Sequence, residues 1–313
     1  MTPAQKGKLL VTGSTGQIGS YVVEEAKHRG WLVNGLDLRP DAHTTHVGDI
    51  RRPEDVRAAM QGCDAVIHCA AQISVQGSIE DPVGDASHNI TGTITLLESA
   101  RRIDIKRFVN VSSAAVYGNP QALPIAESHP TLPLSPYGAS KLAAEGYARM
   151  FHLLHGLETV TVRPFNVYSV RQDPSNPYSG VMSKFAARTR NRESPIVFGD
   201  GAQTRDFIHA QDVASALLEA ASLASPIPAG ATINLGSGRE VSVADLAALF
   251  IKASGHLGLK TVHAPPRSGE IQRSIADVTL ARKYGLTSQI PLERGIQTLM
   301  APQPAVEKPT LGL

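Results

Sequence analysis

The chain has 313 residues, of which 42% are hydrophobic and 19% are charged, and its formal net charge is +2. This composition is typical of a globular protein, and so small a net charge argues against a nucleic-acid partner. Apolar runs such as residues 64–71 have only the length of a strand, and residues 1–8 lack the apolar core of a signal peptide. The sequence therefore predicts a cytoplasmic protein without a membrane partner.

In the first half of the chain, apolar runs of strand length alternate with segments of helical periodicity. We predict strands at residues 8–12, 32–36, 65–69, 107–111 and 160–162, and helices at residues 18–29, 53–60 and 89–101. This alternation is typical of an α/β fold with a doubly wound parallel sheet, the Rossmann arrangement. At this length we expect one large domain with a smaller attached lobe rather than two independent domains.

The pattern changes after residue 162. A stretch rich in proline and glycine follows, and we expect it to form substrate-binding loops rather than further sheet layers. A helix is predicted at residues 214–223, a strand at 232–235 and a helix at 243–253. We therefore predict a Rossmann domain at residues 1–165 with returning segments at about 204–237, and a substrate-binding lobe made of residues 166–203 and 238–313. The proline-rich tail after Met300 is predicted to be disordered.

The sequence offers no support for a metal site. Its two cysteines are Cys63 and Cys69, and Cys69 lies in an apolar run, so we interpret them as small core residues and exclude a disulfide framework. No Cys-x-x-Cys motif occurs, and no His-x-x-x-His pair lies beside a carboxylate ligand. We predict that the protein binds no metal.

A glycine-rich loop joins the first predicted strand to the first predicted helix. Its residues include Gly13, Thr15, Gly16, Gln17, Ile18 and Gly19, in which the glycines have the spacing Gly-x-x-Gly-x-x-Gly. Glycines allow a tight turn and a close approach of the backbone to a pyrophosphate, which the positive end of the following helix attracts. We expect this loop to bind a dinucleotide.

An acidic residue distinguishes the two nicotinamide dinucleotides. Asp37 follows the second predicted strand, 18 residues beyond Gly19. At about this spacing a carboxylate accepts hydrogen bonds from the adenosine ribose hydroxyls. It would also repel the 2′-phosphate of NADP, which Arg39 alone would attract. The sequence therefore favours NAD.

Three residues form a candidate catalytic group. Tyr137 and Lys141 lie four residues apart, so in a helix their side chains share one face. A lysine ammonium group near a phenol favours the phenolate, which predicts a lowered pKa for Tyr137 and a role as general base. Ser113 follows the strand at residues 107–111, at the sheet edge where ligands bind, and is expected to hydrogen-bond to the reacting oxygen.

In these motifs the sequence resembles the extended short-chain dehydrogenase/reductase family, and within it the NAD-dependent nucleotide-sugar epimerases of the UDP-glucose 4-epimerase type. The resemblance runs from residue 9 to about residue 277 and includes residues 48–50, 68–72, 89–93, 163–166, 171–174, 198–201, 204–209 and 267–271. It implies an enzyme that uses bound NAD to act on a UDP-sugar.

The resemblance also implies further binding residues. Those for NAD are Asp49, Ile50, Ala70, Ala71, Gln72, Asn89, Ser112 and Pro164, besides Tyr137 and Lys141. Those for the UDP-sugar are Asn166, Arg205 and Arg267 near the diphosphate, Val181 and Phe198 beside the uracil, and Glu270 near the ribose, besides Ser113 and Tyr137. Guanidinium groups match phosphate oxygens in fork geometry, which agrees with the two arginines.

The residues that follow Ser113 bear on the reaction. Resembling 4,6-dehydratases carry an Asp-Glu pair there, whereas this chain has Ala114 and Ala115, so elimination would lack its proton carriers. The sequence favours a UDP-hexose 4-epimerase, in which Tyr137 takes the proton of the sugar 4-hydroxyl while hydride passes from C4 to NAD and returns to the other face.

Two alternatives stay open. The first is another NAD(P)-dependent nucleotide-sugar oxidoreductase or carbonyl reductase, for which an arginine in place of Asp37 would be typical. The second is a non-catalytic dinucleotide sensor, for which the loss of Tyr137 or Lys141 would be typical.

The resemblance implies two further features. A position seven residues beyond the pocket arginine limits the space at the sugar C2 substituent, and the small Ser274 there predicts that N-acetylated UDP-hexoses also enter. Alternatively, Ser274 only begins a strand at residues 274–276 and another side chain closes the site. The helices at residues 89–101 and 140–155 carry apolar positions on more than one face, and the matching helices of the family build a dimer interface, so we expect a homodimer.

Overall fold

The computed structural model describes residues 7–172, 180–266, 269 and 271–301. Arg267, Glu270 and the tail beyond residue 301 therefore lie outside the described residues. Within the described part of the chain, no helix is both long and apolar enough to span a bilayer. The cytoplasmic location stays a prediction.

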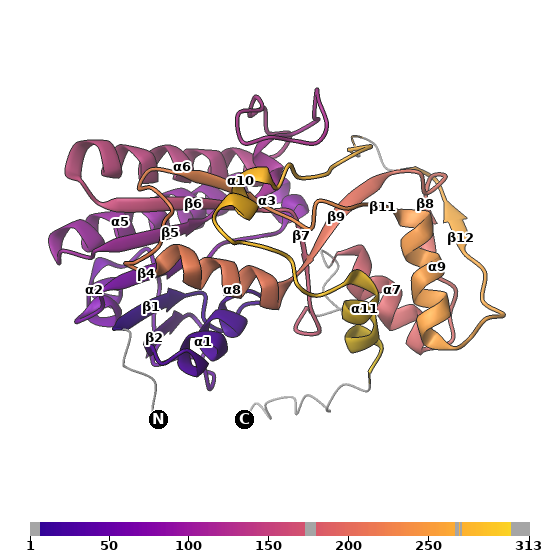
Figure 1. The fold of residues 1–313 in the computed structure, drawn as a ribbon, viewed down its shortest axis with the longest axis horizontal. Coiled ribbons are helices and arrows are strands. Elements are labelled where there is room, and N and C mark those ends of the chain that lie inside the picture. Colours follow the sequence, from indigo (N-terminus) through magenta and orange to yellow (C-terminus); the bar gives the residue numbers. More distant parts are fainter. Residues whose placement is uncertain (1–6, 173–179, 267–268, 270, 302–313) are drawn as a thin grey trace.

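The larger part of the molecule is built around a seven-stranded parallel sheet (Figure 1). Its strands are β1 (Lys8–Thr12), β2 (Leu32–Asp37), β3 (His46–Val47), β4 (Ala65–His68), β5 (Arg107–Val111), β6 (Glu158–Pro164) and β10 (Thr232–Leu235). Their order is β10-β6-β5-β4-β1-β2-β3, and every neighbouring pair is parallel. The predicted Rossmann fold is confirmed, and the strand order reverses between β1 and β4, where such sheets bind their ligands.

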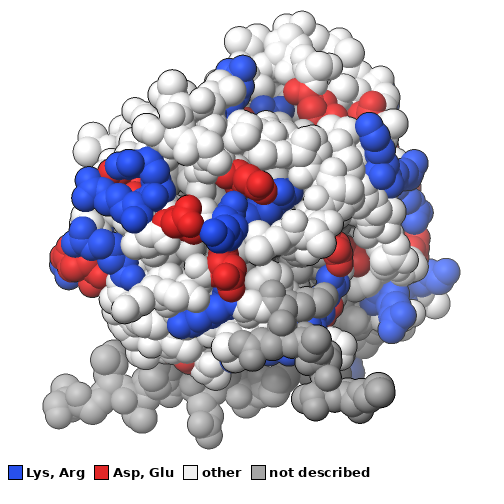
Figure 2. All heavy atoms as spheres, turned by 60° about the vertical axis from the view of Figure 1, so that its left-hand side comes forward, with Lys and Arg blue, Asp and Glu red and all other residues white. Residues whose placement is uncertain are grey.

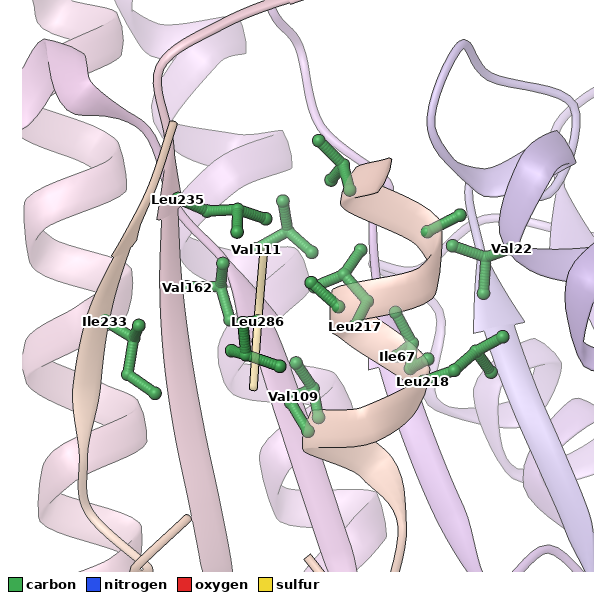
Figure 3. Packing of buried hydrophobic residues seen from close by; sticks show 14 of the residues in the cluster. Val22, Ile67, Val109, Val111, Val162, Leu217, Leu218, Ile233, Leu235 and Leu286 are labelled. Atoms are coloured by element: carbon green, nitrogen blue, oxygen red, sulfur yellow. The ribbon is translucent and has the colours of Figure 1, made fainter. Parts of the chain in front are cut away.

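Helices cover both faces of this sheet (Figure 1). They are α1 (Gly19–His28) and α8 (Ala210–Ala221) on one face, and α2 (Pro53–Met60), α5 (Gly92–Arg102) and α6 (Pro136–His155) on the other. Successive residues of a strand point to opposite faces, so each strand contributes side chains to a hydrophobic core on either face of the sheet. In β5, Val109 and Val111 join the core beneath α8, whereas Phe108 joins the core beneath α5 and α6. Figure 3 shows Val109 and Val111 beside Leu217 of α8.

The smaller lobe lies beyond one end of the large sheet (Figure 1). It contains a sheet of the order β11 (Glu240–Ser242), β9 (Thr204–His209), β7 (Asn166–Tyr168), and a pair formed by β12 (Val262–Ala264) and β8 (Ile196–Phe198). The helices α7 (Val181–Arg190), α9 (Val243–Ser254) and α11 (Leu292–Met300) enclose a core that includes Phe185, Phe250 and Ile296. Because β10 rejoins the large sheet after β7 to β9, the two parts are interleaved. The domain boundaries themselves stay a prediction.

Short elements complete the chain. They are α3 (Val75–Glu80), α4 (Pro82–Ala86), a π-helical turn (Ser87–Thr91), a 3-10 turn (Ala114–Val116) and α10 (Thr279–Lys283). Two sequence-based expectations are wrong. The stretch after residue 162 is not only loops, since it holds β7, α7, β8 and β9. Residues 274–276 form no strand, because only Ala276 makes an isolated bridge, to Ile125.

Charges of both signs are interspersed on the surface. On the face drawn in Figure 2, Lys and Arg groups lie among Asp and Glu groups and are separated by uncharged residues. Ion pairs such as Arg101 with Glu98, at 2.7 Å, also bring opposite charges together on the surface. The protein therefore presents no broad field of one sign on that face.

Candidate active site

The glycine-rich loop after β1 is packed too tightly for side chains at two of its positions. Gly13 has φ +67°, and a Cβ there would lie 2.7 Å from the backbone nitrogen of Ala70. A Cβ on Gly19 would lie 2.0 Å from the carbonyl oxygen of Gly13. The Gly13 nitrogen also donates to the Leu36 carbonyl at 2.8 Å. The loop is therefore held against the ends of β2 and β4, and neither Gly13 nor Gly19 has room for a side chain.

A cavity of about 380 Å³ lies at the carboxyl ends of β1, β2 and β4. Ten of the predicted cofactor residues line it: Gly13, Gly16, Gln17, Ile18, Gly19, Asp37, Asp49, Ile50, Ala70 and Ala71. Its lining also includes Leu36, Leu38, Arg39, Gly48, Cys69, Ile73 and His88, which were not among the predicted site residues. All of these except Arg39 adjoin a predicted residue in sequence, which was the available signal, and Arg39 lies two positions beyond Asp37.

Acidic groups mark the adenosine side of the cavity. The two carboxylate oxygens of Asp37 accept hydrogen bonds from the backbone nitrogens of Thr15 and Arg39, each at 3.1 Å. A carboxylate has further lone pairs, so Asp37 can still accept ribose hydroxyls. Arg51 binds both oxygens of Asp49 and thereby holds the pKa of that carboxyl below its ordinary value. Both groups fit a dinucleotide that carries no additional phosphate on its adenosine ribose.

Thr15 lies in the glycine-rich loop after β1, and the other predicted cofactor residues lie around the ends of β4, β5 and β6. Asn89 exchanges hydrogen bonds with the backbone of Gln72, through its oxygen to the Gln72 nitrogen and through its nitrogen to the Gln72 carbonyl, each at 2.9 Å. The Ser112 hydroxyl donates to Glu145 at 2.5 Å. Pro164 is in register with Leu235 of β10. Asn89 therefore fixes the backbone of the loop that follows β4, and the Ser112 hydroxyl is already engaged in a hydrogen bond.

The structure brings the three candidate catalytic residues together. Ser113 begins the 3-10 turn directly after β5, and Tyr137 and Lys141 lie on the first two turns of α6. Ser135 caps that helix, since its hydroxyl accepts the Gly138 N–H at 3.1 Å. The Ser113 side chain hydrogen-bonds to that of Tyr137. Serine, tyrosine and lysine thus meet at the carboxyl edge of the sheet.

The electrostatics of this group differ from the prediction. Burial raises the pKa of Tyr137 above its ordinary value, the Asp85 carboxylate raises it further, and the Ser113 hydrogen bond opposes both. Burial also lowers the pKa of Lys141 to about 8. The predicted lowering of the Tyr137 pKa by Lys141 is therefore wrong for the protein without its ligands, because removal from water outweighs the hydrogen bond from Ser113.

A buried polar network fixes the strands around the group. Arg163 of β6 binds both oxygens of Glu145 at 2.9 and 2.6 Å, and Glu145 lies one turn after Lys141 on α6. Arg163 also donates to the Tyr117 hydroxyl at 2.9 Å, and Tyr117 donates to Asn234 of β10 at 2.6 Å. The network ties α6 to β5, β6 and β10, and so holds Lys141 against the strand that ends beside Ser113.

Within the described residues, the predicted UDP-sugar residues other than Ser113 and Tyr137 come from the lobe. Asn166 begins β7 and is exposed, Val181 begins α7, and Phe198 ends β8. Arg205 of β9 donates to the carbonyls of Thr204 and Ile271 at 2.7 and 2.8 Å, so its guanidinium ties β9 to the segment that leads to the half-buried Ser274. Arg267 and Glu270 lie outside the described residues.

Arg171, from a segment that resembled the sugar side of the pocket, instead contacts α1. Its guanidinium lies 4.0 Å from the ring centroid of Tyr21 and pairs with Glu24 at 2.5 Å. Among the described residues, no cluster of three or more histidine, cysteine, aspartate or glutamate side chains has the arrangement of a metal site.

Comparison with known proteins places this geometry in a family. The model of the NAD dependent epimerase/dehydratase family matches residues 9–236. The chain belongs to this family. A putative UDP-glucose 4-epimerase of Methanocaldococcus jannaschii is 39% identical over 303 residues, which cover 93% of this chain and 97% of that protein.

Two solved structures have the same fold. The UDP-glucose 4-epimerase of Thermotoga maritima, solved with UDP-glucose, has a TM-score of 0.88 at 32% identity and covers 94% of this chain and 97% of its own. The UDP-N-acetylglucosamine 4-epimerase of Methanobrevibacter ruminantium, solved with UDP-N-acetylmuramic acid, has a TM-score of 0.87 at 30% identity, with coverage of 95% and 97%. The predicted enzyme class and cofactor are confirmed: this family member is an NAD-dependent nucleotide-sugar epimerase.

Proposed function

We propose that the protein interconverts UDP-hexoses that differ in configuration at C4, with Tyr137 as the base. The observation that carries the proposal is the meeting of Ser113, Tyr137 and Lys141 beside the cofactor cavity, with Ala114 and Ala115 where a dehydratase would need a second acid–base pair. The relative at 39% identity, described as a putative UDP-glucose 4-epimerase, and the solved UDP-glucose 4-epimerase at 32% identity support the same substrate class.

The cavity residues fit NAD. The loop of Gly13 and Gly19 leaves backbone N–H groups open to a pyrophosphate, and Asp37 offers acceptors to the ribose hydroxyls. When bound, NAD supplies an acceptor for the hydride of the sugar C4 and later a donor that returns it. The chain's own residues supply the binding, the orientation and the proton transfer.

Tyr137 takes the proton of the sugar 4-hydroxyl, and Ser113 hydrogen-bonds to the same oxygen. Since burial raises the pKa of Tyr137, a positive charge has to lie near the phenol if it is to act as a base at neutral pH. Lys141 provides that charge below pH 8, where it is protonated. When hydride returns to the opposite face of the 4-keto sugar, Tyr137 gives the proton back.

Replacing Tyr137 by Phe tests this role. The phenol oxygen is lost while the ring is kept, so turnover should fall by a factor of about 10² to 10⁴ and NAD should remain bound. Tyr147→Phe, on the same helix, is the matched control and should retain activity. Near-native turnover in the Tyr137→Phe protein would contradict the mechanism.

The substrate range is proposed to include N-acetylated UDP-hexoses. Ser274 is half-buried and small, and a similar solved protein is described as a UDP-N-acetylglucosamine 4-epimerase. If Ser274 borders the C2 substituent, Ser274→Tyr should exclude the N-acetylated substrates and spare UDP-glucose, whereas Ser274→Ala should leave both classes accepted. If the unmodified protein already fails on UDP-N-acetylglucosamine, the limit lies elsewhere.

A homodimer is proposed from exposed apolar residues on α6. Met150, Leu153 and Leu154 are exposed on that helix, and Leu154 is 73% exposed. Leu154→Glu should yield a monomer by light scattering, because it buries a charge in the interface. Leu257→Glu, at a position that is 75% exposed beyond α9, should leave the dimer intact. A monomeric mass for the unmodified protein at micromolar concentration would contradict the proposal.

A further inference from the structure

Buried charges in the described residues are nearly all compensated by partners. Arg107 pairs with Glu158, and Glu145 pairs with Arg163. Asp206 accepts hydrogen bonds from Ser237, Gly238 and Ala276, and Asp212 accepts them from Ser288 and Ile290. Asp85 and Lys141 are less well satisfied: in the described part of the chain neither has an ion pair, the Asp85 carboxylate accepts a single hydrogen bond, and the Lys141 side chain makes none. A buried charge is costly unless an opposite charge compensates it.

Asp85 lies on α4 and is 1% exposed. Its Oδ1 accepts a hydrogen bond from the Asn89 amide at 3.0 Å, while its Oδ2 is buried and has no hydrogen-bond partner among the described residues. A neutral amide is therefore its only side-chain donor there. The second oxygen is free to interact with a cation.

Lys141 lies beyond ion-pair distance of this carboxylate, but within the range at which the Asp85 charge raises its pKa. The Asn89 nitrogen that binds Asp85 is also 3.1 Å from the hydroxyl of Ser140, the residue that precedes Lys141 on α6. Lys141 is 4% exposed, and its side chain has no hydrogen bond or ion pair within the described residues. Asn89 thus bridges the turn that carries Asp85 and the helix that carries Lys141.

We propose that Asp85 is a positioning residue of the reaction, whose buried carboxylate is the counter-ion of the Lys141 ammonium group. The inference rests on the proposed roles of Tyr137 and Lys141. It adds a residue that touches neither substrate nor cofactor and acts through the lysine.

The other groups around Lys141 do not take this role. The charge of Glu145 is compensated by Arg163, which binds both of its carboxylate oxygens. Burial raises the pKa of the Cys69 thiol to about 12, so Cys69 is neutral near pH 7. Tyr137 is likewise uncharged there, since its pKa is raised. His88, on the turn after α4, hydrogen-bonds to the Gly84 carbonyl at 2.8 Å.

The charge pair has a defined consequence for the chemistry. Burial favours the neutral amine of Lys141, and Cys69, Glu145 and Asp85 oppose that effect, in decreasing order. Cys69 is neutral near pH 7 and the charge of Glu145 is compensated by Arg163, so Asp85 is the uncompensated anion among the three. With Asp85 in place, the ammonium persists to higher pH and keeps a positive charge near Tyr137. The carboxylate raises the pKa of Tyr137 directly, but it also extends the pH range over which Lys141 keeps the charge that stabilises a phenolate.

NMR titration of Lys141 tests the pair without requiring turnover. The full chain, labelled with ¹³C-lysine and saturated with NAD, is titrated with the Lys141 signal assigned by Lys141→Met. Asp85→Asn should lower the pH midpoint of Lys141 by about one unit, and Asp85→Glu should restore it. Asp81→Asn is the matched control, because Asp81 is exposed and asparagine also caps α4, so the midpoint should not move.

An unchanged Lys141 midpoint in Asp85→Asn would overturn the proposal. If that variant does not fold, Asp85→Ser, which removes the charge and leaves a smaller side chain, is titrated in the same way, and an unchanged Lys141 midpoint there would overturn the proposal. With UDP-hexose, the alkaline limb of the kcat profile of Asp85→Asn should shift to lower pH, whereas a structural defect would lower kcat equally at every pH. Absence of turnover in the unmodified protein would refute the proposed function and leave the titration informative.

Discussion

Replacing Lys141 by Met should stabilise the protein near neutral pH while it abolishes activity. Burial lowers the pKa of Lys141 from 10.5 to about 8. The difference of about 2.5 pH units corresponds to roughly 3 kcal/mol, at about 1.4 kcal/mol for each unit. Below pH 8 the folded protein contains a buried ammonium group at this cost in free energy. A methionine side chain of similar length is uncharged, so the variant does not have this cost.

The sign of the pH dependence follows from proton binding. Between pH 8 and pH 10.5 the unfolded chain holds a proton at Lys141 that the folded protein has lost, so the free energy of unfolding rises with pH over that interval. The advantage of Lys141→Met should therefore reach about 3 kcal/mol at pH 7 and shrink toward pH 10.5.

Urea unfolding of both proteins at pH 7 and at pH 10.5 measures this difference. Methionine also alters packing, so the change of the difference with pH is decisive rather than its size at one pH. Lys27→Met, at an exposed position of α1, is the control and should show no such change. An equal stability difference at the two pH values would refute the account of Lys141 as a buried cation.

Two further predictions concern packing and buried polar groups. The side-chain amide of Asn110 on β5 is buried and has no hydrogen-bond partner among the described residues. Asn110→Val should therefore raise the free energy of unfolding, measured by urea titration, by about 1–2 kcal/mol. A decrease would show that the amide has a partner. A Cβ on Gly295 would lie 2.0 Å from the Tyr168 hydroxyl, so Gly295→Ala should lower the melting temperature, with a loss of about 1–3 kcal/mol. Adding Tyr168→Phe should recover part of that loss, and no recovery would place the strain elsewhere.

Local patterns predicted the elements whose signal lies within one segment. The helix predicted at residues 53–60 and the strand predicted at residues 232–235 coincide with α2 and β10. The glycine-rich loop was recognisable because its three glycines stand where the backbone of one strand–turn–helix unit leaves little room for a Cβ atom.

The short strands of the lobe carry no such local signal. β8 and β12 have three residues each and pair across more than 60 positions of sequence. Their pairing depends on long-range contacts, so the alternation of apolar residues in so few positions did not reveal them.

The pKa shifts of the site also could not be predicted from the sequence. The Tyr-x-x-x-Lys spacing indicated two neighbouring side chains, but not how far burial would remove them from water. Asp85 went unnoticed because its relation to Lys141 passes through Asn89 and the packing of α4 on α6. A carboxylate on a short helix resembles any solvated charge until its burial is known.

The most direct test of the central claim follows the configuration at C4 by NMR. The purified protein is incubated with UDP-galactose without added cofactor, in parallel with its Tyr137→Phe variant. The account predicts that UDP-glucose appears until an equilibrium mixture is reached, with no accumulation of NADH, and that the variant leaves the substrate unchanged. Retention of the C4 configuration with NAD bound, across UDP-galactose and the N-acetylated UDP-hexoses, would contradict it, as would stoichiometric release of a keto sugar.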